Sequence, residues 1–215
     1  KVGSIAERVY EILKLTEKGQ VLQRFCFAFL QKISYKEEVV EGLLVSGIVD
    51  FLGKWIVRGI KEKAHYFCIE YACAFLANVL RHKSCFNFLI DNDTIYKSTV
   101  ENVIEAINTA ESEDPIKHLL ICLCYLNKAD FDKYKIDCQI NEKISSFKSN
   151  FMGKKMETET KKVAQKVILG LCDYICAYSD ENDDSQVNEI LSNYKKVDNQ
   201  IINLEAFQDE IVNTS

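Results

Sequence analysis

The chain has 215 residues, of which 47% are hydrophobic and 27% are charged, and its formal net charge at pH 7 is −5. This composition is typical of a folded domain and excludes an intrinsically disordered chain. A single proline and eight glycines leave few turn residues, which favours helices over an all-β fold. The negative charge argues against a partner that is a nucleic acid or an anionic membrane.

Apolar residues at three- and four-residue spacing predict a helix in each successive segment of the chain. A first pair covers 4–15 and 19–34. A short helix then follows Tyr35, a glycine corner lies at Gly47, and a middle helix begins at Ile48. The remaining predicted helices are, in chain order, 66–82, 84–92, 97–110, 115–127, 129–138, 141–150 and 157–178, with Pro115 in the first turn of its helix.

The chain repeats itself with an offset of 46 residues. Residues 25–33 superpose on residues 71–79, and Ala28/Ala74, Phe29/Phe75 and Leu30/Leu76 are identical pairs. A period in the forties is the length of an armadillo or HEAT unit, and the order short, middle and long helix favours armadillo, because HEAT units have two helices.

The sequence therefore predicts an all-α fold, a right-handed armadillo-type α-solenoid of about four three-helix repeats with a C-terminal helical cap. No single repeat can cover its own apolar stripe, so we expect Phe25, Phe27, Phe29 and Leu30 to lie in the interior. The expected domain is 1–179, with a partial first repeat at 1–34 and repeats at about 35–82, 83–127 and 128–179. An acidic connector and two polar capping helices occupy 180–215, where nine acidic and two basic residues fall.

The nine cysteines lie inside apolar helical stretches, so we expect free buried thiols and not a disulfide framework. Cys172 and Cys176 share a helix face, but a zinc site needs two further ligands that the spacing does not supply. Cys85 beside His82 lacks a third group for nucleophilic catalysis. We therefore expect no enzyme, no metal and no cofactor, while a degenerate thiol or metal enzyme is the weakest of three alternatives.

The long helices of an armadillo array line its concave groove. Importin-type proteins place a Trp and an Asn there in successive repeats; here Asn78 falls on the Asn position, but Ala74 occupies the Trp position. The positions equivalent to Asn78 are Lys32 and Cys124, so a nuclear-import receptor is disfavoured. We predict Lys32 and Asn78 to be exposed and to contact a protein partner. A second candidate surface for an acidic partner is a lysine cluster, with an ordinary solvated helix face as its alternative: Lys148, Lys154, Lys155 and Lys162.

Two strings carry a family resemblance: Leu30-Gln31-Lys32-Ile33-Ser34, and Ile69-Glu70-Tyr71-Ala72-Cys73-Ala74-Phe75-Leu76-Ala77-Asn78-Val79. They resemble the armadillo region of the armadillo-repeat-containing protein nine family, LisH-domain proteins of basal bodies and cilia, over roughly residues 20–178. The resemblance implies a non-catalytic ciliary module that works with TOG-array regulators of microtubules.

The chain begins with Lys, and we expect it to be a fragment whose dimerisation, if any, uses a region outside it. No apolar run approaches the roughly 20 residues that span a bilayer, so we expect a cytoplasmic protein, at the cilium or basal body if the resemblance holds. The alternative function is a general cytoplasmic armadillo adaptor that binds an extended peptide in its concave groove.

Overall fold

A computed structural model describes residues 2–16, 21–126, 139–155 and 159–176, together with Glu189 and Ser192. All regular secondary structure in these residues is α-helical, which confirms the predicted all-α class for this part of the chain. Two compact units, Lys1–Ile140 and Asn141–Ser215, divide the chain and are described separately. The helices are α1 (Val2–Leu15), α2 (Val21–Ile33), α3 (Glu37–Val45), α4 (Ile48–Lys61), α5 (Tyr66–Leu80), α6 (Lys83–Asp91), α7 (Asp93–Thr109), α8 (Glu113–Tyr125), α10 (Gln139–Met152) and α11 (Glu159–Cys176).

The helix boundaries of the first unit follow local capping chemistry. Gly47 has φ +83°, a left-handed conformation that suits glycine, and it turns the chain between α3 and α4. Pro115 lies in the first turn of α8, where its missing N–H has no helical partner to lose. The predicted corner and the predicted proline position are both confirmed. The middle helix that is predicted to begin at residue 97 is α7, and it begins earlier, at Asp93. The reason is that the carbonyl of Asn92 already accepts hydrogen bonds from the N–H groups of Ile95 and Tyr96.

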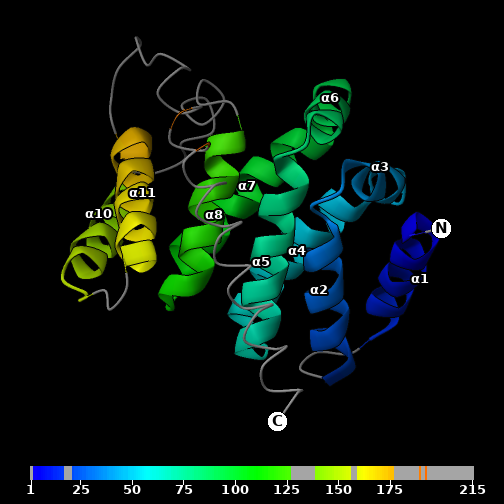
Figure 1. The fold of residues 1–215 in the computed structure, drawn as a ribbon, viewed down its shortest axis with the longest axis horizontal. Helices are drawn as coiled ribbons and strands as arrows, with labels where there is room; N and C mark the ends of the chain where they lie inside the picture. Colours follow the sequence, from blue (N-terminus) through cyan, green and yellow to red (C-terminus); the bar gives the residue numbers. More distant parts are fainter. Residues whose placement is uncertain are drawn as a thin grey trace. The chain divides into compact units, whose positions relative to one another are not determined.

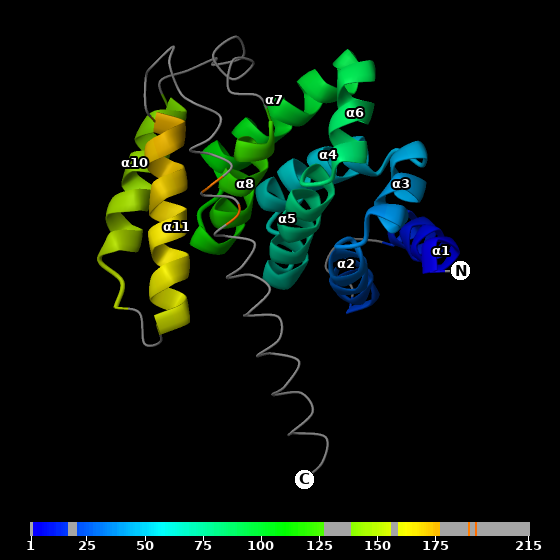
Figure 2. The ribbon, with the colours of Figure 1, turned by 45° about the horizontal axis from the view of Figure 1, so that its top comes forward.

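Helices at corresponding places along the chain pack on one another. The long helices α2, α5 and α8 form one row, which Figures 1 and 2 show side by side. Behind this row α4 packs on α7, and the short helices α3 and α6 form a third contact. Because α2 and α5, or α4 and α7, begin about 45 residues apart, the sequence period is also a stacking period.

The core of the first unit is built from the predicted apolar rows, with one correction. Phe27, Leu30, Phe75 and Leu76 are completely buried, and the Phe27 ring lies 4.5 Å from that of Trp55. The expectation that Phe25 and Phe29 are interior is wrong, because both side chains are exposed. They lie on a side of α2 that no described helix covers.

The second unit contributes α10 and α11 to the described residues. Phe147 and Phe151 stack at 5.3 Å on α10, and the side-chain amide of Gln165 on α11 donates to the Phe151 carbonyl at 2.6 Å. The predicted helix 129–138 lies outside the described residues. So do the acidic connector and capping helices of 180–215, apart from Glu189 and Ser192.

Candidate protein-interaction surface

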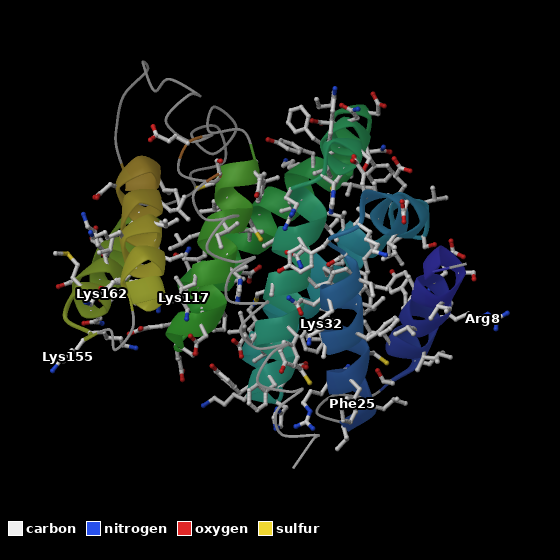
Figure 3. All side chains as sticks on the ribbon, in the orientation of Figure 1. Arg8, Phe25, Lys32, Lys117, Lys155 and Lys162 are labelled. Carbon is white, nitrogen blue, oxygen red and sulfur yellow. The ribbon has the colours of Figure 1, made fainter. Side chains whose placement is uncertain are left out.

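The row of α2, α5 and α8 presents one solvent-facing side, which we call the long-helix face and define by Lys32, Phe67, Tyr71 and Lys117. Figure 3 labels Lys32 on α2 and Lys117 on α8. Lys32 is exposed, as predicted, and the other three side chains are exposed or half-buried. The face therefore combines cationic groups with aromatic rings.

Helix α2 supplies the positive end of the long-helix face. Its two charged residues, Arg24 and Lys32, are both cationic. The Arg24 guanidinium lies 5.2 Å from the centre of the Phe25 ring, within cation–π range. An acidic or apolar partner fits this helix better than a basic one.

An aromatic cluster covers the first turns of α5. The His65 imidazole caps the helix by accepting the Phe67 N–H at 3.3 Å, and its ring stacks on that of Phe67 at 5.7 Å. Phe67 in turn contacts the rings of Tyr66 at 5.2 Å and Tyr71 at 5.9 Å. Tyr66 and Phe67 are 42% and 41% exposed, so two large rings face solvent side by side. Exposed aromatic clusters of this kind are typical of binding surfaces.

A polar triad joins α5 to α8 beside the aromatic cluster. The Tyr66 hydroxyl and the Lys117 ammonium both donate to the carboxylate of Asp114. Burial alone would raise the pKa of Asp114, but these two hydrogen bonds lower it below its ordinary value. The hydrogen bond to Asp114, together with burial, raises the pKa of Tyr66. The triad thus holds Tyr66 as a neutral phenol that orients the cluster.

His118 lies next to this triad on α8 and is half-buried. Burial and the neighbouring Lys117 charge lower its pKa to about 4, against the opposing effect of Asp114. At neutral pH the imidazole is therefore uncharged.

Asn78 is not exposed, so that prediction is wrong. Its side chain is 6% exposed, and its amide donates to the Gln31 carbonyl at 2.9 Å and to the Ser34 hydroxyl at 3.2 Å. The reason is that α2 packs directly on this side of α5, so the position joins two helices and is not open to a ligand. Nearby, the His82 imidazole lies 2.7 Å from the Ser34 carbonyl and strengthens the same contact.

The lysine candidates of the second unit divide into two sets. Lys148 is half-buried, and its ammonium group pairs with the Asp173 carboxylate of α11. Lys154, Lys155 and Lys162 are exposed around the turn from α10 to α11, and Figure 3 shows the last two at that end of the helix pair. Three of the four lysines of the predicted cluster are therefore exposed on the surface.

The cysteines are buried free thiols, as predicted, at all seven positions for which the structure describes the side chain. Burial raises the pKa of Cys85 to about 12 and also raises that of Cys73. A thiol of this kind stays protonated and is a poor nucleophile or metal ligand. Within the described ranges there is no group of three His, Cys, Asp or Glu side chains placed to hold a metal ion.

None of the described helices is both long and apolar enough to cross a membrane. The comparisons with known proteins give no match: no protein-family model, curated protein or solved structure matches the chain.

Proposed function

We propose that this chain is a non-catalytic scaffold that binds a protein partner through the long-helix face, and that its helices form a right-handed armadillo-type solenoid of about four three-helix repeats. The observation that carries the proposal is the exposed aromatic cluster on α5, with Tyr66 and Phe67 held in place by the cap of His65 and by the bond to Asp114. Rigid aromatic side chains lose little conformational entropy on binding and are enriched at interaction hot spots.

The packing of the helices supports the solenoid. Contacts run from α2 to α5 to α8 and from α4 to α7, so these five helices rest on counterparts about one period away. The raised pKa values of Cys73 and Cys85 argue against a nucleophilic thiol at these two positions, because the thiolate is the reactive form.

An affinity pull-down from ciliated cells tests the binding face. The purified chain serves as bait, and the test variant is Phe67→Ser, with Lys32→Glu as a second variant on α2. We expect each variant to reduce recovery of the partner by about tenfold, because loss of one hot-spot side chain typically costs 1–2 kcal/mol or more. The matched control is Ile90→Ser on α6, which removes an apolar side chain outside the face that is more exposed than Phe67, 62% against 41%. Equal recovery by all three variants would refute this assignment.

We further propose that the scaffold works at the cilium or basal body with TOG-domain microtubule-associated proteins, a placement supported by the two resemblance strings at 30–34 and 69–79. Tagging the protein in ciliated cells and imaging it tests the location. A diffuse cytosolic signal, with no TOG-domain protein among the captured partners, would favour the general cytoplasmic adaptor that binds an extended peptide along the same face.

A further inference from the structure

Two neighbouring helices of the first unit carry most of its exposed apolar side chains. Of the thirteen large hydrophobic side chains exposed in the described residues, seven belong to α1 and α2. A contiguous apolar surface is rare on a monomer and indicates contact with another structural element. These seven are Ile5, Ile12, Leu15, Val21, Leu22, Phe25 and Phe29.

Helical spacing places three apolar residues of α1 on one stripe. Ile5, Val9 and Ile12 are separated by four and three residues, which keeps them on the same side of the helix. Ile5 is 50% exposed, Ile12 is 43% exposed and Val9 is half-buried. The Glu7 carboxylate lies 3.0 Å from the position that a Cβ on Gly42 of α3 would take, so it marks the side of α1 that faces α3. Because α1 packs on both α2 and α3, the stripe on the opposite flank borders α2.

Helix α2 carries a matching stripe. Leu22, Phe29 and Ile33 are separated by seven and four residues and share one side of this helix. Leu22 is 51% exposed, Phe29 is 39% exposed and Ile33 is half-buried. Arg24 marks the side of α2 that faces α5, because its charge opposes the rise that burial causes in the pKa of Cys68. The stripe lies on the opposite flank of α2 and therefore borders α1.

The two stripes meet along the line where α1 packs on α2. The two helices run in opposite directions, as Figure 1 shows. Paired apolar stripes of this spacing on neighbouring helices form the surface on which a further helix packs in helical bundles. The exposure of the side chains shows that no described helix covers this surface. We call it the α1–α2 seam and define it by Ile5, Val9, Ile12, Leu22, Phe29 and Ile33.

Both borders of the α1–α2 seam are cationic. On α1, Arg8 lies one turn from Ile5 and one turn from Ile12. On α2, Lys32 lies one turn beyond Phe29. Both cationic side chains are exposed, and Figure 3 shows the Arg8 side chain pointing away from α1 into solvent. Among the described residues, no carboxylate pairs with either cation.

The acidic groups of these two helices lie away from the seam. Helix α2 contains no Asp or Glu. The two acidic residues of α1, Glu7 and Glu11, lie one turn apart on the flank towards α3, and Glu11 pairs with Lys14 at 2.6 Å. A second copy of the chain would therefore bring cations against cations. A helix with an apolar stripe and carboxylates on both sides of it complements the seam in shape and in charge.

We propose that the α1–α2 seam binds an acidic amphipathic helix of a partner protein. The apolar stripe of that helix packs between α1 and α2, and its carboxylates pair with Arg8 and Lys32. This inference does not depend on the proposed function, because the aromatic cluster of the long-helix face takes no part in it. Since Lys32 borders both surfaces, the tests use Arg8 and Leu22.

A pair of synthetic helices tests the charge complementarity. The probe is a fluorescein-labelled peptide of three heptads with Leu at positions a and d, Glu at e and g, and Ala or Gln elsewhere. Its counterpart has Lys at e and g. Like charges at e and g keep each peptide monomeric. Fluorescence anisotropy with the full chain should show at least about tenfold tighter binding of the Glu peptide. Equal affinities for the two peptides, or no binding of either, would overturn the proposal.

Two variants separate the charge from the apolar stripe. Arg8→Glu should weaken binding of the Glu peptide by about fivefold and strengthen binding of the Lys peptide, because one ion pair is replaced by a repulsion. Leu22→Ser should weaken binding of the Glu peptide by about tenfold. The matched controls are Arg58→Glu on α4 and Ile90→Ser on α6, two exposed positions outside the seam. Controls that weaken binding as much as the test variants would show that the peptide binds elsewhere.

Two further outcomes would overturn the proposal by assigning the seam to another occupant. A concentration-dependent dimer in analytical ultracentrifugation that Leu22→Lys abolishes would assign it to a second copy of the chain. Maleimide labelling of Leu22→Cys, measured at residue 22 by mass spectrometry, gives the other. Labelling that is slow at every concentration, and fast once Glu205, Asp209 and Glu210 are replaced by lysine, would assign the seam to the acidic segment of the chain itself.

Discussion

Asn78 shows how a single polar side chain joins two helices of this fold. Replacing it with Ala removes its hydrogen bonds to the Gln31 carbonyl and to the Ser34 hydroxyl. We expect Asn78→Ala to lower the free energy of unfolding by about 1–3 kcal/mol, because each of the two lost hydrogen bonds contributes about 0.5–1.5 kcal/mol. Urea denaturation measures the change. Lys32→Ala is the matched control at the equivalent exposed position and should alter the free energy of unfolding by less than about 0.5 kcal/mol.

His118 makes the stability of the first unit depend on pH. Its pKa is about 4 in the folded chain and 6.5 when exposed, so between these values the unfolded chain binds more protons. The contribution of neutral His118 to the free energy of unfolding is therefore fully present above about pH 6.5. It is lost as the pH drops towards 4, which lowers the free energy of unfolding by about 1–3 kcal/mol for a half-buried group. Urea denaturation from pH 7 to pH 4 measures the loss. His118→Gln should flatten the profile over this interval, and an unchanged slope would contradict the prediction.

At the scale of single elements, the corner before α4 depends on one glycine. A Cβ at Gly47 meets no atom within 4 Å, so an alanine there costs only backbone strain. We expect Gly47→Ala to lower stability by about 1–2 kcal/mol, the penalty for a left-handed L-residue. Gly3 also has open space around its Cβ position but lies inside α1 with ordinary helical backbone. Gly3→Ala should therefore stabilise the chain by up to about 1 kcal/mol. Thermal melts should show a lower Tm for Gly47→Ala and a higher Tm for Gly3→Ala.

The elements themselves could be predicted well from the sequence, because each has a local cause. Spacing of apolar residues predicts helices close to α4, α5 and α8, while Gly47 and Pro115 mark their boundaries. The exposure of particular residues could not be predicted in this way. Leu22 and Cys68, or Lys32 and Asn78, occupy the same place in the period, and only the presence or absence of a stacked helix makes one exposed and the other buried.

The proposed binding face could be predicted only in part from the sequence, for a similar reason. Lys32 is identified correctly as exposed, but the aromatic cluster on α5 was missed. An apolar start of a helix, such as the segment with His65, Tyr66 and Phe67, usually indicates burial in the core. Their exposure follows from the place of this turn at the end of α5, where the neighbouring helices leave the rings uncovered. An apolar run directly after an N-cap histidine was the available signal.

Across the whole first unit, stability should be shared between stacked helices because no helix has a core of its own. Leu76 is completely buried on α5, the helix that packs on α2, α4 and α8. An aspartate there places an unpaired carboxylate in the apolar interior, so Leu76→Asp should cost more than about 4 kcal/mol and unfold the unit. Leu76→Ala, which leaves only a cavity, should cost about 2–5 kcal/mol.

Hydrogen exchange measured by mass spectrometry separates shared from local stability. For Leu76→Asp we expect α2, α5 and α8 to lose amide protection together, because removing the middle helix of the row deprives both neighbours of their stacking surface. Val45→Asp on α3 is the control, since this side chain is 87% exposed and should leave protection unchanged. Protection lost from α5 alone, with α2 and α8 still protected, would mean that each helix is held by its own contacts and that the row does not unfold as one cooperative unit.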